Sequence, residues 1–343
     1  MRLSHLGDLI HALPVWNAVA RAFPDAEMAF ATQPAYAQLL RGLPRLGRIV
    51  TFERDGGLAA WWRFRRQARA WRPTWTIDCQ GNWKGAIATW VSGAPRRSGL
   101  APSDWREKSA RRLCNDLASD DDRATGQDHA VDRQLALARH VTGAPAAADF
   151  DLGLTRAERE RGRAALFARL PRTAHGAPLL LHLARPGDPR SWPALSFFEL
   201  AREAAEAGRP VLVLGGPNEA PLAAAAPSLT GVHTEIGTFD LRALAGLFAA
   251  AAEAGATLVA CDSGPAHLAA AVGLAVHLLH GPQDPQRTGP WPPPGRQDFP
   301  SSHRTQSAAI ELACRPCISR TCVNPLGPRC LEELNSAEVS ARL

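Results

Sequence analysis

Short apolar runs alternate with longer amphipathic stretches through the second half of the chain. The runs 178–183, 210–214 and 256–260 hold five or six residues each and are almost wholly apolar. Runs of this length without polar alternation are typical of strands that are buried on both faces of a parallel sheet. Helical spacing follows the first of them, at 197–207. This alternation predicts an α/β fold with parallel sheets.

The first half repeats the pattern less regularly. We expect strands at 26–31 and 48–52 with a helix at 36–43 between them, and a strand followed by a turn at 75–81. Apolar residues at helical spacing predict another helix from Leu9 to Val19. A strand should precede that helix, but only Met1 to Leu3 are present to form it. The sequence therefore predicts either a stunted first strand or a start that lies further upstream.

A chain of 343 residues is long enough for two domains with separate cores. The Ala- and Pro-rich segment 143–148 is typical of the start of a linker. We predict a Rossmann-like domain at 1–150, a second at 151–310 and a Cys-rich tail at 311–343.

The composition is ordinary for a globular protein, with 45% hydrophobic and 21% charged residues. The formal net charge of +6 favours anionic partners, such as phosphorylated small molecules, nucleic acid or an anionic membrane surface. The polar start shows no secretory leader, and the most apolar window, 241–260, is interrupted by Arg242 and Glu253. We therefore expect a cytoplasmic protein whose seven cysteines stay reduced.

The clearest chemical signal is a strand, a tight turn and a helix at 256–273. Ser263 or Gly264 suits the start of the helix, and Pro265 fits its first turn. The free N–H groups of a helix start attract anions, Gly264 lets a phosphate approach the backbone, and His267 lies one turn further on. The alternative is an ordinary strand-to-helix junction with a satisfied histidine.

Two more polar side chains follow predicted strands of the same domain. Arg190 can bind a phosphate, and Glu219 can accept a bond from a ribose hydroxyl. Because ligands of open α/β sheets bind beyond the carboxyl ends of the strands, the three segments together predict a nucleotide site. The chain has neither a P-loop lysine motif nor a G-x-G-x-x-G fingerprint, which argues against an ATPase and a classical dehydrogenase.

Two features of the first domain are candidates for binding or catalysis. Asp8 lies at a helix start, where the dipole keeps a carboxylate ionised and available as a base; a plain N-cap is the alternative. The helix 61–72 interleaves Trp with Arg, including Arg63 and Arg66. It suits a phosphorylated acceptor or lipid headgroups, although such helices also occur with Trp inward and Arg solvated. Nucleic-acid binding through it is a further alternative, but no nucleic-acid module accompanies it.

The tail holds four cysteines: Cys314, Cys317, Cys322 and Cys330. Thiolates clustered in this way can form a structural zinc site or an iron–sulfur site. Four reduced thiols in a loop are the alternative. We expect Cys79, Cys114 and Cys261 to be small buried hydrophobic residues.

Seven segments in the same order resemble glycosyltransferase family 9, the ADP-heptose:lipopolysaccharide heptosyltransferases. They are spread over nearly the whole chain, and together they are far more specific than any one of them. The segments are Arg2–Asp8 with Pro14, Ile77–Lys84, His129–Arg133, Arg190–Pro193, Gly215–Glu219, Asp262–Ala271 and Gly281–Pro290.

The resemblance implies a GT-B fold, in which two Rossmann-like domains with parallel sheets face a central cleft, and a C-terminal tail that packs back toward the N-terminal domain. It implies inverting transfer of L-glycero-D-manno-heptose from ADP-heptose to the lipopolysaccharide inner core, with a lipid A–Kdo acceptor and no cofactor required for catalysis. The enzyme would be cytoplasmic and peripheral on the inner face of the inner membrane, in contact with its anionic surface, and would not bind nucleic acid.

The resemblance also assigns roles to residues. Asp8 would be the general base, the helix start at 263–267 would stabilise the departing diphosphate, and Glu219 would hold the ribose. The donor set would be Arg190, Glu219, Asp262, Ser263, Gly264, Pro265 and His267. The acceptor set would be His5, Gly7, Gln80, Lys84, His129, Arg63 and Arg66. Arg190 stands where the family has Lys, which keeps the charge but replaces a point charge by a planar fork.

Two alternatives to this function stay open. The same fold could use another nucleotide sugar, because discrimination between sugar rings depends on shape contacts that a sequence does not reveal. A non-catalytic nucleotide-binding relic is the other alternative, and turnover that depends on Asp8 would distinguish it from an enzyme.

Overall fold

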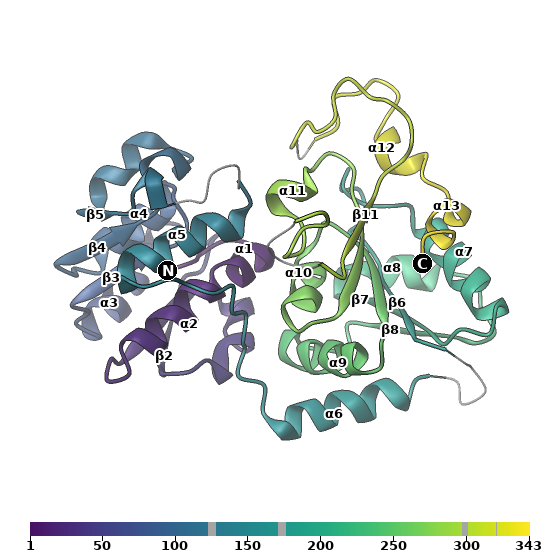
Figure 1. Cartoon of the computed structure of the whole chain (residues 1–343), viewed down its shortest axis with the longest axis horizontal. Coiled ribbons are helices and arrows are strands. Elements are labelled where there is room, and N and C mark those ends of the chain that lie inside the picture. The colour runs from purple at the N-terminus through teal and green to yellow at the C-terminus, as the bar shows by residue number, and fades with distance from the viewer. Residues whose placement is uncertain (123–127, 171–175, 297–300, 320) are drawn as a thin grey trace. The chain divides into compact units, whose positions relative to one another are not determined.

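The computed structural model describes residues 1–122, 128–170, 176–296, 301–319 and 321–343 (Figure 1). The chain divides into two compact units, Met1–Gly153 and Leu154–Leu343. Each unit is an α/β structure in which every strand pairing is parallel, as the sequence predicts.

The second unit contains one six-stranded sheet with the order β11-β10-β9-β6-β7-β8. Its central strands are short and fully buried because they are runs of Leu, Val and Ala that suit a sheet covered on both faces. The strands are β6 (Leu179–His182), β7 (Val211–Gly215), β8 (Val232–Ile236), β9 (Thr257–Cys261), β10 (Ala275–Leu279) and β11 (Arg304–Gln306).

The chain changes direction across this sheet at β6. It runs from β6 outward through β7 to β8, and then returns to place β9 on the other side of β6. The loops after β6 and β9 therefore diverge at the carboxyl ends of two neighbouring strands. Such a switch point is where open α/β sheets bind their ligands.

The helices of the second unit pack against this sheet and against one another. Gly162 of α6 meets α9 so closely that a Cβ there would lie 2.2 Å from the carbonyl oxygen of Gly246. Arg242 of α9 joins Glu158 of α6 through two bonds, of 2.6 and 2.9 Å. The helices are α6 (Arg156–Phe167), α7 (Ala194–Glu206), α8 (Ala220–Ala224), α9 (Leu241–Glu253), α10 (Gly264–Ala271), α11 (Pro285–Thr288), α12 (Arg329–Glu332) and α13 (Ser336–Ser340).

The C-terminal tail belongs to the second unit. Leu331, Leu334 and Val339 are buried in its core. Trp192 donates its indole N–H to the carbonyl oxygen of Leu334 at 2.7 Å, and Ser336 donates to Glu203 of α7 at 2.9 Å. The expected packing of this tail toward the first domain stays a prediction; within the second unit, its last helix, α13, packs against α7 (Figure 1). The reason is the apolar spacing of its leucines, which completes the core beneath α7.

The first unit contains two separate sheets instead of one. The strands are β1 (Met28–Thr32) and β2 (Leu46–Thr51) in one sheet, and β3 (Trp75–Asp78), β4 (Arg96–Gly99) and β5 (Asp116–Leu117) in the other. The helices are α1 (Leu6–His11), α2 (Leu13–Ala22), α3 (Gly57–Ala70), α4 (Trp83–Val91) and α5 (Ala130–Thr142). Short 3₁₀ turns lie at Pro34–Tyr36, Leu39–Gly42, Pro102–Asp104, Lys108–Leu113 and Asp120–Asp122, and in the second unit at Pro217–Glu219.

Two helical predictions needed correction. The helix expected at 36–43 is two 3₁₀ turns, because Pro34 and Pro44 bracket a segment too short for a regular helix. The helix expected from Leu9 to Val19 is divided at Ala12, where α1 ends and α2 begins with Pro14 in its first turn.

Met1, Arg2 and Leu3 are the residues present for the strand expected before α1, and they form a short segment that is not itself a strand. The amino group of Met1 donates to the carbonyl oxygen of Ile77 at 2.6 Å, and Cys79 N–H donates to Met1 at 3.2 Å. Arg2 N–H donates to the carbonyl oxygen of Ala31 at 3.0 Å. The segment thus contacts the carboxyl ends of both β1 and β3. Among the described residues, no helix is long and apolar enough to cross a membrane.

Candidate functional site

Asp8 lies in the first turn of α1 and is held by two neighbours. Its Oδ1 atom is 2.8 Å from Nη2 of Arg2, and its Oδ2 atom accepts a hydrogen bond from Ser4 at 3.0 Å. Arg2 also donates to the carbonyl oxygen of Cys79. Because Arg2 is part of the segment that contacts β1 and β3, the two sheets of this unit position the carboxylate.

The electrostatics of Asp8 favour its ionised form. Burial alone would raise the pKa of this carboxyl, but the charge of Arg2 and the hydrogen bonds from Ser4 and Arg2 outweigh burial and hold the pKa below its usual value. The side chain keeps 37% of its surface exposed. Asp8 is therefore a carboxylate that a substrate hydroxyl can reach, with a cation beside it.

Gln80 and Lys84 follow β3, where the sequence analysis placed acceptor-binding residues. Gln80 accepts from Leu3 N–H at 2.8 Å and donates to Asn82 at 2.8 Å, and Asn82 caps α4. The Lys84 ammonium lies 5.8 Å from the ring of Phe52. Burial, followed by the charge of Arg54, lowers the pKa of Lys84. Gln80 thereby links the start of the chain to α4, and Lys84 supplies a positive charge on α4.

Asp78 is a buried carboxyl that sequence reasoning did not single out. It accepts from Gln80 N–H at 2.7 Å and Gly81 N–H at 3.4 Å, and burial raises its pKa. A Cβ at Gly85 would lie only 2.5 Å from its Oδ1 atom. The position of Asp78 at the end of a predicted strand was the available signal. Its contacts indicate that it fixes the turn that carries Gln80.

The remaining acceptor candidates near α1 and α5 have different surroundings. His5 is exposed directly before α1, whereas Gly7 is buried within it. His129 is 2% exposed, caps α5 by accepting from Val131 N–H at 3.1 Å, and packs its ring edge-on against His11. These contacts favour a structural role for His129.

Helix α3 separates its tryptophans onto two faces. Trp61 packs on Phe52 at a ring distance of 4.5 Å, whereas Trp62 is 59% exposed. The Arg66 guanidinium lies 5.0 Å from the Trp62 ring, and Arg63 pairs with Glu53 at 2.5 Å. An open groove on this face is lined by Trp62, Arg65, Arg66, Arg69, Ala70 and Arg72. We call these six residues the basic groove.

In the second unit, the loop after β6 carries a tightly held arginine. The Arg190 guanidinium forms a fork with Asp188, with Nε 2.9 Å from Oδ1 and Nη2 2.5 Å from Oδ2. This pairing, led by the bonds from Arg190, lowers the pKa of Asp188. Trp192 N–H donates to the Cys261 sulfur at 3.1 Å, which ties the loop to the end of β9. Asp188 was not predicted, although it stands two residues before Arg190.

Helix α10 begins directly after β9, at the other side of the switch point. Pro265 occupies its first turn, and Ser263 is the extended residue before it. His267 is buried, with its Nε2 atom 3.3 Å from Asp262 Oδ1. The helix start therefore combines N–H groups and an imidazole with the nearby carboxylate of Asp262, which itself would repel an anion.

Glu219 lies after β7, the neighbour of β6 on the other side. It is 8% exposed and accepts from Gly216 N–H at 2.8 Å. Burial raises the pKa of this carboxyl. The structure thus gathers Arg190, Glu219 and the 262–267 turn at the carboxyl ends of three adjacent strands, as the sequence predicts. Chemically, this edge offers a guanidinium and a helix start for phosphates and a carboxylate for hydroxyls.

The predicted metal site is not supported. Cys314, Cys317 and Cys322 are exposed and Cys330 is buried, and all four line one small cavity. Nevertheless, over the ranges that the structure describes, no three or more His, Cys, Asp or Glu side chains are placed to hold a metal ion. The other three cysteines, Cys79, Cys114 and Cys261, are buried as expected, and burial raises the pKa values of Cys114 and Cys261 to about 12.

Comparison with known proteins gives a family and a fold. Residues 61–326 match the family described as glycosyltransferase family 9 (heptosyltransferase). Lipopolysaccharide heptosyltransferase 1 of Pseudomonas aeruginosa is 28% identical over 336 residues, which cover 94% of this chain and 86% of that protein.

Solved structures share the fold. The E. coli heptosyltransferase WaaC with ADP has a TM-score of 0.70 and 20% identity, covering 99% of this chain and 96% of that chain. The E. coli ADP-heptose lipopolysaccharide heptosyltransferase II has a TM-score of 0.69 and 19% identity, covering 98% and 94%. The expected GT-B type of α/β fold is thereby confirmed.

Proposed function

We propose, from the premise that this chain belongs to glycosyltransferase family 9, that it transfers L-glycero-D-manno-heptose from ADP-heptose to the lipopolysaccharide inner core. The chain is a glycosyltransferase of the heptosyltransferase family. The heptose, the adenine nucleotide and the lipid A–Kdo acceptor are part of the proposal. One observation carries it: Arg190 with Asp188 and the start of α10 flank the switch point between β6 and β9.

The second unit supplies the donor site in this proposal. The N–H group of Gly264 and the imidazole of His267 donate to the diphosphate, and Arg190 adds a positive charge. Asp188 holds the guanidinium as a planar fork, so Arg190 keeps its orientation without the ligand. Glu219 accepts from the ribose hydroxyls. The choice of nucleotide is supported by the similarity to lipopolysaccharide heptosyltransferase 1 of P. aeruginosa and to the E. coli heptosyltransferase WaaC, which was solved with ADP.

Catalysis requires a base for the acceptor and stabilisation for the leaving group. Asp8 accepts the proton of the acceptor hydroxyl as its oxygen forms a bond to the anomeric carbon of the heptose. The bond from that carbon to the phosphate oxygen breaks, and the electron pair leaves with ADP. Attack opposite the leaving group inverts the anomeric centre. The negative charge that develops on the diphosphate is stabilised by the helix start and Arg190, with no cofactor required.

The acceptor is anionic, and the first unit offers cations for it. His5 directly precedes α1, Gln80 bonds to Leu3 N–H, Lys84 lies on α4, and Arg63 and Arg66 lie on α3. We propose that the basic groove with its exposed Trp62 contacts anionic headgroups, which would hold the enzyme at the inner face of the inner membrane.

A nucleotide series tests the donor assignment. We would measure the unfolding temperature with ADP, UDP, GDP and CMP at the same concentration. A nucleotide present at about 100 times its Kd stabilises by about 2.7 kcal/mol and raises Tm by a few degrees. The proposal predicts a rise with ADP alone. A rise with UDP or GDP instead would keep the glycosyltransferase but replace the donor, and no rise with any of them would contradict the nucleotide site itself.

A further inference from the structure

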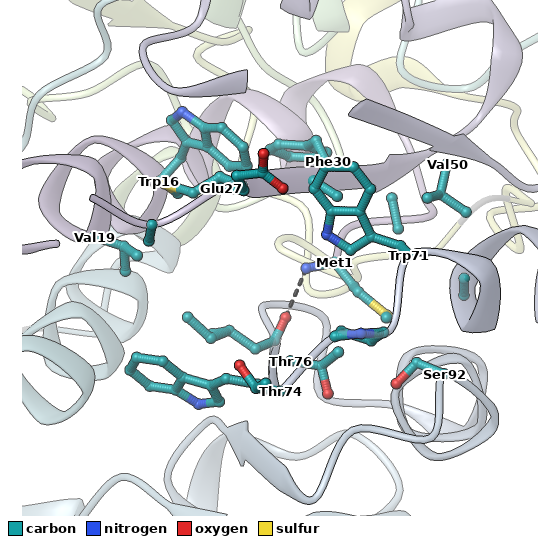
Figure 2. Close-up of a pocket in the computed structure, with 18 of the residues that line it drawn as sticks. Met1, Trp16, Val19, Glu27, Phe30, Val50, Trp71, Thr74, Thr76 and Ser92 are labelled. Carbon is teal, nitrogen blue, oxygen red and sulfur yellow. Dashed lines mark hydrogen bonds between the residues drawn. The ribbon is translucent and has the colours of Figure 1, made fainter. Parts of the chain in front are cut away.

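A cavity of about 550 Å³ lies inside the first unit, between β1 and β3 (Figure 2). Its wall is mainly apolar and aromatic, and includes Val19, Phe30, Val50, Trp71 and Ile77. Protein interiors are close-packed, and voids much larger than a water molecule are few. A space of this size with a mainly apolar wall is therefore unusual, and it is large enough to hold several buried side chains.

The cavity lies between two open sheet edges. β1 ends the sheet β1-β2 on this side, and β3 ends the sheet β3-β4-β5. Both strands run parallel to their neighbours and carry apolar side chains, which is typical of strands in the middle of a sheet and not at its edge.

Met1 and Arg2 already pair with both edges, in the pattern of a parallel strand. The amino group of Met1 donates to Ile77, and its carbonyl oxygen accepts from Cys79, so Met1 stands opposite Asp78. Arg2 N–H donates to Ala31, so Arg2 stands opposite Thr32. Figure 2 shows Met1 at the cavity, with its bond to the carbonyl oxygen of Ile77 dashed.

This register extends directly into the cavity. The three residues before Met1 would stand opposite Ile77, Thr76 and Trp75 on one side and Phe30, Ala29 and Met28 on the other. Because N–H and C=O groups alternate in direction along a strand, Ala29 and Trp75 turn their backbone groups toward the same space that Ala31 and Ile77 face. Because Met1 bonds to β3 and Arg2 bonds to β1, the two strands are spaced at that point for a single strand between them.

The second unit gives an independent reference for the topology. There, β6 is followed by β7 and β8 on one side and by β9, β10 and β11 on the other. A strand in the cavity, leading into Arg2, would be followed by β1 and β2 on one side and by β3, β4 and β5 on the other. The first unit would then have the same strand order as the second.

We propose that a β-strand formed by residues that precede Met1 in the full polypeptide occupies this cavity. The strand pairs in parallel with β1 and β3 and joins the two sheets into one sheet of order β2-β1-strand-β3-β4-β5. It is apolar, because both of its faces meet the cavity wall. The strand also leads directly into Arg2 and so fixes Arg2 and, through it, the carboxylate of Asp8. In the second unit, β6 leads into the loop that carries Arg190 in the same way.

The test compares three proteins: residues 1–343, the same chain extended before Met1 by Met-Lys-Val-Leu-Ile-Val, and the same chain extended by a Gly-Ser segment of equal length. We expect the apolar extension to raise Tm by at least about 5 °C over both others, because it buries several apolar side chains. We also expect slower hydrogen exchange, by at least about tenfold, at the amides of Ala31 and Ile77. A cooperative transition seen only with the apolar extension would support the proposal equally.

Two results would overturn it. One is equal Tm values and equal exchange at Ala31 and Ile77 in the apolar and Gly-Ser proteins. The other is stabilisation of residues 1–343 by a small apolar ligand, such as an alkyl alcohol, that the apolar extension does not prevent, since the cavity would then be a ligand pocket. Neither readout uses glycosyl transfer, so the outcome is independent of the proposed function.

Discussion

Nη2 of Arg2 lies 2.8 Å from Oδ1 of Asp8, so the proposed base is paired with a cation before any substrate binds. The pair keeps the carboxylate ionised but also weakens it as a base, since a lower pKa means a lower proton affinity. An acceptor hydroxyl must therefore reach Asp8 beside Arg2.

Replacing Arg2 should move the acidic limb of the pH profile. In the proposed mechanism deprotonated Asp8 is the active form, so activity should fall as pH decreases through its pKa, which Arg2 holds below the usual 3.8. In Arg2→Gln, Asp8 stays buried but loses the compensating charge. The midpoint of the acidic limb of the kcat/KM profile should therefore move to a pH higher by at least about one unit. Arg2→Lys, which keeps the charge, is the matched control. Identical limbs in Arg2→Gln and the unchanged enzyme would show that Asp8 is not the titrating base.

Arg190 should tolerate lysine better than alanine. Arg190→Lys keeps a cation beside the diphosphate, although it loses the fork with Asp188, and should retain kcat within about tenfold. Arg190→Ala removes the charge that is proposed to stabilise the leaving group and should lower kcat by about 100-fold or more. Steady-state kinetics with saturating acceptor measures both. An equal loss of kcat in the two variants would mean that catalysis depends on the fork with Asp188 and not on the positive charge.

Glu219 should determine the preference for a ribose over a deoxyribose. We expect the unchanged enzyme to bind ADP more tightly than 2′-deoxy-ADP, and Glu219→Gln to weaken ADP binding by about tenfold with little effect on the deoxy nucleotide. Calorimetric titration of both nucleotides into both proteins gives the four Kd values. If Glu219→Gln weakens the binding of both nucleotides equally, the bond between Glu219 and Gly216 has a structural role and Glu219 does not contact the ribose.

The ion pair between Glu158 and Arg242 should make stability depend on pH. The bonds from Arg242 lower the pKa of Glu158 to about 2, below its ordinary 4.5. A depressed carboxyl pKa stabilises the fold above pH 4.5, and that contribution is lost as pH falls toward 2. Glu158→Gln should therefore lower the unfolding free energy by about 1–3 kcal/mol at pH 7, with the difference closing at acidic pH.

The matched control is Glu160→Gln. Glu160 pairs with Arg156 on the exposed face of the same helix, with side chains 61% and 92% exposed. The Glu160→Gln substitution should lower the free energy of unfolding by less than about 0.5 kcal/mol at any pH. Denaturant titrations from pH 2 to 7 would measure both variants, and parallel curves for the two would contradict the role given to Arg242.

The second unit was predictable because its signals are local. Runs such as Val211–Leu214 are buried on both faces, so their composition alone indicates central strands. The switch point follows from strand order, which brought Arg190 and the 262–267 turn to one edge. The pairing of Arg190 with Asp188 was not predicted, because a sequence shows two nearby charges but not the loop geometry that joins them.

The first unit and the tail were harder for physical reasons. Leu331 and Leu334 mark the tail as buried, but apolar spacing does not say which core it completes. That His129 caps α5 follows from its burial and its bond to Val131, neither of which a sequence pattern shows. The role of Arg2 depends on contacts with β1 and β3, which are distant in sequence.

Heptosyl transfer by the chain and by Asp8→Asn tests the central claim most directly. The assay supplies ADP-heptose and a heptose-free lipid A–Kdo acceptor, and follows ADP release together with the mass of the product. We predict transfer by the unchanged chain and a loss of at least about 100-fold in Asp8→Asn, with ADP still raising Tm equally in both. Transfer at an unchanged rate in Asp8→Asn, or no transfer by a chain that binds ADP, would contradict the account.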